Sequence, residues 1–94
     1  PISGRQARRV LRNLNQMLGI ELMAAAQAID FRRRQLGPEA QLGRGTAIAY
    51  ELVRRDIPFL PEDAELAPHL ATAAHLVASG AILQAVEQHL AATL

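Results

Sequence analysis

The sequence predicts an all-α fold, with one long bundle helix followed by three shorter helices, as part of a larger helical bundle. Half of the 94 residues are hydrophobic and only three are aromatic. Most of the hydrophobic residues are Ala and Leu, which favour closely packed helices over sheets. In the first third of the chain they recur at intervals of three and four, the period of a helix. The length allows at most one ordinary domain.

The first helix is expected to begin near Gly4 and to end by Leu36. Ser3, followed three residues later by Gln6, has the form of a capping box. The arginines at 32–34 complement the dipole at the carboxyl end, and the Gly-Pro pair at 37–38 cannot continue the helix. We therefore divide the chain into a long core and oligomerisation helix, residues 1–36, and a small-helix region, residues 37–94.

Two neighbouring apolar stripes run along this helix. The first comprises Ala7, Leu11, Leu14, Leu18, Leu22, Ala25 and Ile29, and the second Val10, Met17, Ile20, Ala24, Ala28 and Phe31. From Met17 onward the helix is apolar around most of its circumference, so it must be surrounded on several sides. Glu21 and Gln27 lie in this part and need partners, because burying an unpaired polar group is costly. A structural hydrogen bond and the wall of a polar cavity both remain open for them.

The first helix is too long for this chain to cover. From Gly4 to Phe31 it would measure about 42 Å, whereas a compact domain of this length has a radius of gyration of about 13 Å. The missing cover must come from other subunits or from more of the same polypeptide. We therefore expect the isolated chain to associate with itself.

Three shorter helices are predicted after residue 38. The first runs from Ala47 to Arg55, with Thr46 as its N-cap and Ile48 and Leu52 as its buried pair. A Pro-rich loop, anchored by Phe59 and Leu60, then follows an extended path.

Pro68 suits the first turn of the next helix, which is predicted to end at Ser79-Gly80. Leu70, Ala73, Ala74 and Val77 share its inner face. The last helix is predicted from about Ala81 to Ala92, with Ile82, Ala85, Val86 and Leu90 facing inward.

Charge is unevenly distributed along the chain. Residues 1–34 carry seven Arg and two acids, and residues 35–94 carry three Arg and seven acids, so that +5 and −4 give the net charge of +1. No aromatic residue interleaves with the first arginines, and Lys is absent, so ion pairs and solvated faces explain this pattern better than nucleic-acid binding. The absence of Cys and of a signal-like or membrane-length apolar run indicates a soluble, cytoplasmic protein.

No catalytic, cofactor-binding or metal-binding residue is assigned. His69, His75 and His89 are not one helical turn apart, and the acids Glu62, Asp63 and Glu65 lack the register of a calcium loop and precede a helix. The GRG run at 43–45 neither follows a strand nor completes a phosphate-binding motif. A flexible helix connection explains it.

The tripeptide Ala78-Ser79-Gly80 has the order that cyclises into an electrophilic cofactor in one class of enzymes. His75 lies four residues before Ser79, but this spacing is too common to indicate a nucleophile. Ser79 is better explained as the N-cap of the last helix, and Gly80 as the residue at which the backbone changes direction.

Three segments resemble the histidine ammonia-lyase branch of the aromatic amino-acid ammonia-lyase family, in the same order. They are LGIELMAAAQAIDFRR at 18–33, LGRGTAIAYELVRRDIPFLPED at 42–63 and LAPHLATAAHLVASGAI at 66–82. Glu21 after Ile20 is more similar to the histidine branch than to the phenylalanine branch. The resemblance covers nearly the whole chain, although none of these segments is a catalytic motif.

The resemblance implies a helical, homotetrameric, cytoplasmic lyase of histidine catabolism that converts L-histidine to urocanate and ammonia. Its 4-methylidene-imidazol-5-one group would form upstream, from an internal Ala-Ser-Gly, and the catalytic tyrosines would also lie upstream. Our interpretation is therefore a C-terminal segment that supplies bundle core and subunit contacts, binds the rest of the polypeptide and the other subunits, and is inactive alone. Pro1 in place of an initiator methionine agrees with a fragment. No cofactor is expected in this chain, and neither nucleic acid nor membrane is expected as a partner.

Two alternatives remain open at this point. The parent enzyme could act on phenylalanine or tyrosine, because the residues that select the side chain lie outside the chain. Alternatively, the chain could be a free-standing helical interaction module whose basic first helix docks on an acidic partner or on nucleic acid.

Overall fold

The computed structural model describes residues 3–62 and 64–93, with side chains up to residue 91, and consists of four helices. These are α1 (Gly4–Leu36), α2 (Arg44–Asp56), α3 (Ala67–Ser79) and α4 (Ala81–Thr93). No strand occurs in the described residues, so the predicted all-α fold is confirmed. Asp63, one of the three acids considered above, lies outside the described residues.

Helix α1 has the predicted start and end. The Gln6 amide donates to Ser3 Oγ over 3.2 Å, and the Ser3 amide donates to Gln6 Oε1 over 3.1 Å, which completes the capping box. Gly37 ends the helix with φ of +94°, in the region that favours glycine, and its amide donates to the Arg33 carbonyl over 2.9 Å. The 33 residues form a rod of about 50 Å.

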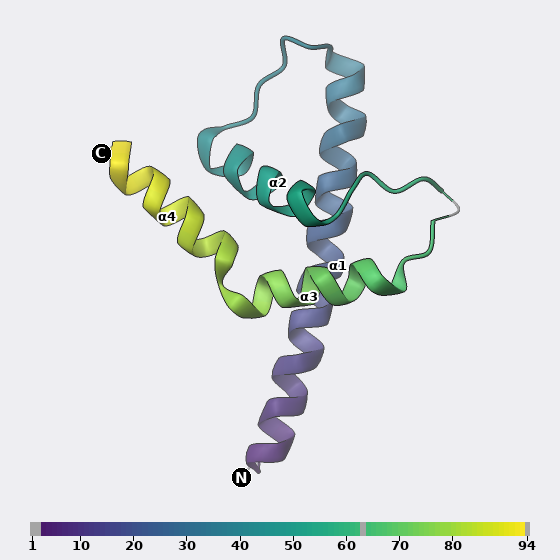
Figure 1. Ribbon diagram of the computed structural model, residues 1–94, viewed down its shortest axis with the longest axis vertical. Helices are drawn as coiled ribbons and strands as arrows, with labels where there is room; N and C mark the ends of the chain where they lie inside the picture. Colours follow the sequence, from purple (N-terminus) through teal and green to yellow (C-terminus); the bar gives the residue numbers. More distant parts are fainter. Residues whose placement is uncertain (1–2, 63, 94) are drawn as a thin grey trace.

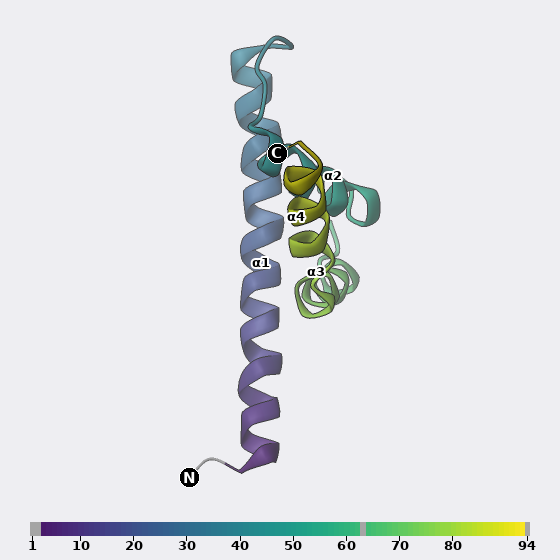
Figure 2. The same ribbon diagram turned by 90° about the vertical axis from the view of Figure 1, so that its left-hand side faces the viewer.

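The other three helices all lie on one side of α1. Figure 2 shows this arrangement edge-on, and Figure 1 shows α3 crossing α1 near its middle. The extents are 52 × 42 × 19 Å and the radius of gyration is 15.4 Å, above the value of about 13 Å for a compact chain of this length. The first half of α1 projects beyond the rest of the molecule (Figure 1).

Helix α2 differs from its prediction at both its start and its buried face. It begins at Arg44 rather than Ala47, because Gly43 takes the N-cap position and its carbonyl accepts the first helical hydrogen bond from Ala47 over 2.8 Å. Ile48 and Leu52 are only half-buried. Val53, with an exposed fraction of 2%, is the residue that α2 places in the core. The helical spacing of the apolar residues does not show which edge of the apolar face of α2 packs against α1.

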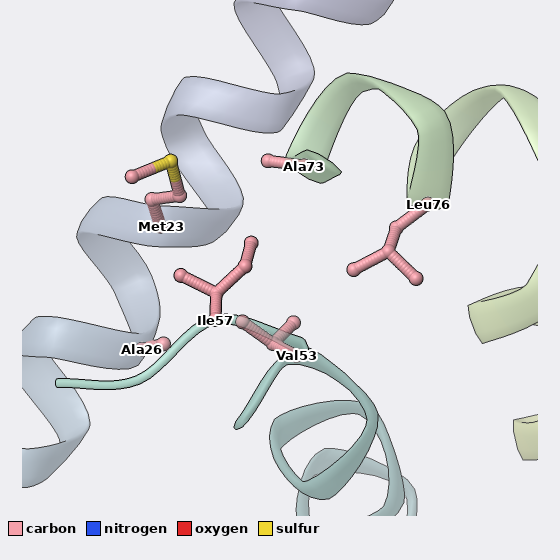
Figure 3. Packing of buried hydrophobic residues seen from close by; sticks show 6 residues of the cluster. All are labelled: Met23, Ala26, Val53, Ile57, Ala73 and Leu76. Carbon is pink, nitrogen blue, oxygen red and sulfur yellow. The ribbon is translucent and has the colours of Figure 1, made fainter. Parts of the chain in front are cut away.

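Six buried residues from α1, α2, α3 and the start of the loop form the core. Figure 3 shows them converging between the helices: Met23, Ala26, Val53, Ile57, Ala73 and Leu76. Leu22, Tyr50, Leu60, Leu70 and Ile82 pack around them. The cluster is small, which agrees with the prediction that α1 needs more cover than this chain supplies.

Helices α3 and α4 meet at Gly80. Its φ of +73° is left-handed, and its amide donates to the Val77 carbonyl over 3.2 Å. Pro68 lies in the first turn of α3, as predicted. The prediction that Leu90 faces inward is wrong, because this residue is 38% exposed near the end of α4.

No single helix in the described residues has the length and composition to cross a membrane. Helix α3 and residues 81–91 of α4, taken together, do have that length and composition, but the two helices are bent by 52° relative to each other.

Candidate functional site

A polar junction joins α1, α2 and the Pro-rich loop. Arg54 on α2 forms an ion pair with Asp30 on α1, and its Nε donates to Asp30 Oδ2 over 3.0 Å. The hydroxyl of Tyr50 donates to the other carboxylate oxygen of Asp30. The side chains of Arg54 and Asp30 are 15% and 19% exposed, so the pair is largely shielded from water. Charge-assisted hydrogen bonds of this kind are stronger than neutral ones.

Gln27 extends this junction to the loop. Its Nε2 donates to the Leu60 carbonyl over 2.9 Å, while its Oε1 accepts from the Leu60 amide over 3.0 Å. Arg54 Nη2 donates to the same Oε1 over 3.2 Å. The prediction that Gln27 needs partners is thus confirmed, and its role is to hold the extended loop against α1. Arg54 also donates to the Ile57 carbonyl over 3.2 Å, at the point where α2 ends.

The ionisation of Asp30 is set by its neighbours. Burial alone would raise the pKa of Asp30, but hydrogen bonds from Tyr50 and Arg54 and the positive charges of Arg54 and Arg34 outweigh it. The pKa of Asp30 is therefore lowered from 3.8, and the carboxylate stays ionised at neutral pH.

Aromatic rings and guanidinium groups surround the junction. Phe31 on α1 and Phe59 in the loop meet edge to face, with centroids 5.5 Å apart. The guanidinium of Arg34 lies 4.5 Å from the Phe59 ring centroid, and that of Arg54 lies 5.6 Å from the Tyr50 centroid. These contacts, together with the hydrogen bonds of Gln27 to Leu60, anchor the loop through Phe59 and Leu60, as the sequence predicted.

A second feature is an open apolar groove between α1 and the elbow of α3 and α4. Its volume is about 600 Å³. The lining residues are Leu18, Glu21, Leu22, Ala25, Leu76, Val77, Gly80, Ile82, Leu83 and Val86. Glu21 is exposed at this groove, so the partner that the sequence analysis expected for it is not supplied by the described residues. An apolar groove open to solvent has the character of a contact surface rather than a catalytic centre.

The remaining sequence candidates that the structure describes do not assemble into a reactive site. No group of three or more His, Asp or Glu in the described part of the chain could hold a metal ion. Ser79 is the last residue of α3, and its Oγ donates to the Leu76 carbonyl over 3.2 Å and accepts from the Ala81 amide over 3.3 Å. The predicted N-cap is displaced by one residue, because Gly80 occupies that position and accepts from the Gln84 amide over 3.0 Å.

Comparison with known proteins identifies the family. Residues 1–55 match the family model described as aromatic amino acid lyase. The chain belongs to this family. Histidine ammonia-lyase of Chloroflexus aurantiacus is 47% identical over 87 residues, which cover 93% of this chain and 17% of the relative. The histidine ammonia-lyases of Sorangium cellulosum and Natranaerobius thermophilus are 42% and 40% identical, again over 93% of this chain and 16% of the relative.

This aromatic amino acid lyase chain thus spans about one sixth of the length of the curated relatives it matches. No solved structure matches it significantly. The junction of Asp30, Tyr50 and Arg54 was not predicted from the sequence. The only signal for it was the presence of opposite charges on two amphipathic helices, a pattern that also describes solvated surfaces.

Proposed function

We propose that this chain is the C-terminal helical segment of an ammonia-lyase that converts L-histidine to urocanate and ammonia. In that enzyme it contributes bundle core and subunit contacts, and the reacting groups lie elsewhere in the polypeptide. The observation that carries this proposal is the 47% identity to a histidine ammonia-lyase over 93% of the chain. The exposed apolar residues of α1 and the open apolar groove support a structural role, because both surfaces need to be buried by residues from outside the chain.

The electrophilic group of the parent enzyme is proposed to form upstream, from another Ala-Ser-Gly. The tripeptide at 78–80 does not fit this group. Cyclisation requires the glycine nitrogen to approach the alanine carbonyl, whereas Ala78 and Ser79 lie in regular helix. The Gly80 amide is engaged with the Val77 carbonyl, and Ser79 Oγ bridges the two helices.

A homotetrameric assembly, a cytoplasmic location and a role in histidine catabolism belong to the same proposal. The other subunits and the rest of the polypeptide are the proposed partners. The surface offered to them comprises the groove and the exposed side of α1, where Val10, Met17 and Ile20 are each more than half exposed.

A chimera tests the proposal. The segment of the Chloroflexus aurantiacus enzyme that aligns with this chain is replaced by this chain, and the formation of urocanate from histidine is followed by absorbance. We expect the chimera to assemble and turn over histidine, and the isolated chain to show no turnover. A matched chimera with Ala73→Asp, at a fully buried position, should lose activity. An intact chimera that assembles like the relative but is inactive would contradict the proposal.

The same replacement in a phenylalanine ammonia-lyase addresses the substrate. If the chain is specific to the histidine branch, only the histidine chimera should assemble and be active. Activity in the phenylalanine enzyme alone would instead assign the chain to that branch.

The alternative of a free-standing interaction module rests on one observation. Four exposed arginines, Arg5, Arg8, Arg9 and Arg12, lie on the projecting half of α1. Binding to nucleic acid or to an acidic protein that weakens as salt is raised would favour the module. The absence of such binding, together with an active chimera, would favour the lyase segment.

A further inference from the structure

A polar cleft lies between the end of α1, the helix α2 and the connection that joins them, residues 37–43. Figure 1 shows this connection looping out from the end of α1 before it returns to α2. The cleft has a volume of about 340 Å³, within the range of small-molecule sites. The lining residues that could contact a ligand include Arg33, Gln41, Leu42, Ala47, Tyr50 and Glu51.

Two opposite charges line this cleft without pairing. Arg33 belongs to α1 and Glu51 to α2, and both residues are exposed. No ion pair in the described residues involves either side chain. Arg33 instead lies over the ring of Tyr50, with its guanidinium carbon 5.7 Å from the ring centroid. The cleft therefore presents a cation and an anion that are both available to a ligand.

The connection adds hydrogen-bond donors to one wall of the cleft. Residues 41–43 form neither helix nor turn. Within the described part of the chain, the backbone amides of Gln41 and Leu42 donate no hydrogen bond to another residue. Amides of this kind can donate to a carboxylate, and hydrogen bonds to an ionised acceptor are stronger than neutral ones. Leu42 and Ala47 line the same cleft and give it apolar surface.

The two charges restrict the class of ligand. A simple anion would be attracted by Arg33 and repelled by Glu51, and for a simple cation the two effects are reversed. A molecule that carries both charges close together satisfies both side chains. A free α-amino acid has this form, because its carboxylate and its ammonium group are attached to the same carbon.

We propose that this cleft binds a free α-amino acid with an apolar side chain. Arg33 and the amides of Gln41 and Leu42 bind the carboxylate, for which the planar guanidinium group is well suited. Glu51 binds the ammonium group, and the side chain of the ligand packs on Leu42 and Ala47. This binding site goes beyond the proposed function and does not rest on it, because it follows from the residues of the cleft alone.

Three ligands of similar shape test the proposal. L-Leucine carries both charges, isocaproate is leucine without the ammonium group, and isoamylamine is leucine without the carboxylate. We expect the full chain to bind leucine at least about tenfold more tightly than either analogue in isothermal titration calorimetry, because each analogue loses one charged contact. Tyr50 is the only tyrosine and Trp is absent, so the intrinsic fluorescence should change as leucine saturates the cleft.

Two substitutions assign each charge of the ligand to its side chain. Arg33→Gln should weaken the binding of leucine about tenfold but not that of isoamylamine, which has no carboxylate. Glu51→Gln should weaken leucine to a similar extent but not isocaproate, which has no ammonium group. Arg8→Gln and Glu87→Gln are the matched controls, because they change the net charge in the same way at exposed positions outside the cleft. Both controls should bind leucine like the unaltered chain, and circular dichroism checks that all four variants keep their helices.

The absence of leucine binding would overturn the proposal, as would equal affinities for leucine and its two analogues. Equal weakening in the cleft variants and the matched controls would also overturn it, because net charge rather than the cleft would then govern binding. These readouts do not depend on the formation of urocanate. An inactive chimera whose chain binds leucine would therefore reject the proposed function and retain this site, and an active chimera whose chain does not bind leucine would do the reverse.

Discussion

The ion pair between Asp30 and Arg54, which are 24 residues apart in the sequence, joins the long helix to α2. Tyr50 donates a hydrogen bond to Asp30, and Gln27 accepts one from Arg54. The two charges are mostly buried, and each keeps further hydrogen bonds besides the ion pair. A charge in such a place is well stabilised while its partner is present and costly once the partner is removed. This asymmetry makes the junction the most testable part of the fold.

The first prediction concerns loss of one partner. Arg54→Met leaves the Asp30 carboxylate unpaired and removes the hydrogen bonds to Gln27 and the Ile57 carbonyl. We expect a loss of about 2 kcal/mol in the free energy of unfolding, measured by urea denaturation. Combining Arg54→Met with Asp30→Asn should cost less than the sum of the two single changes, since the pair is coupled. Strict additivity would show that the two residues do not stabilise each other.

The second prediction follows from the lowered pKa of Asp30. The pKa of this carboxyl is lower in the folded chain than its usual 3.8, so the unfolded chain binds the proton more tightly. The contribution of the Asp30 carboxylate to stability is therefore fully present above pH 3.8. It is lost as the pH falls through the pKa of Asp30 in the folded chain, which lies below that value. The urea midpoint should decrease over this acidic range.

Asp30→Asn provides the control for that titration. The amide does not ionise, so the variant should start less stable at neutral pH and lose less stability on acidification than the unaltered chain. Parallel curves for the two proteins would mean that other carboxylates account for the acid sensitivity.

The ends of α1 could be predicted because their signals are local. Ser3 and Gln6 lie within one turn of each other, and Gly37 ends the helix by its own backbone conformation. The need of Gln27 for a partner also followed from the apolar residues around it. The identity of that partner did not, because Leu60 is 33 residues away and reaches Gln27 only after the loop folds back.

The buried face of α2 could not be predicted for a related reason. Ile48, Leu52 and Val53 all lie within its apolar sector, and only the angle at which α2 meets α1 selects Val53 for the core. The partner of Glu21 is likewise not determined by this sequence, because the residue faces a groove that the described chain leaves open.

The third prediction concerns the crossing of α1 and α3 at Gly19. A Cβ added there would lie 2.8 Å from the Ala74 nitrogen and 3.0 Å from the Ala73 carbonyl carbon, both backbone atoms. Gly19→Ala should therefore push the two helices apart and cost about 1–3 kcal/mol, even though Ala favours a helix by about 1 kcal/mol. Thermal unfolding followed by circular dichroism measures the change.

Gly4→Ala is the matched control for this crossing. It also lies in α1, but a Cβ there would meet nothing within 4 Å, so the variant should be as stable as the unaltered chain or more so. If Gly19→Ala were equally well tolerated, the close approach of α1 to α3 would be wrong.

The last prediction separates structure from chemistry at Ser79. Its Oγ accepts from the Ala81 amide at the start of α4 and donates to the Leu76 carbonyl, so Ser79→Ala should cost about 0.5–1 kcal/mol. A covalent role would have a different signature, because formation of the cyclic electrophile removes two waters from the peptide that contains Ala78-Ser79-Gly80. Mass spectrometry of the unaltered chain should show this peptide at its full mass, since the Gly80 amide is engaged with Val77 rather than directed at Ala78. A mass deficit of two waters that disappears in Ser79→Ala would overturn the structural role of Ser79 and place the electrophile in this chain.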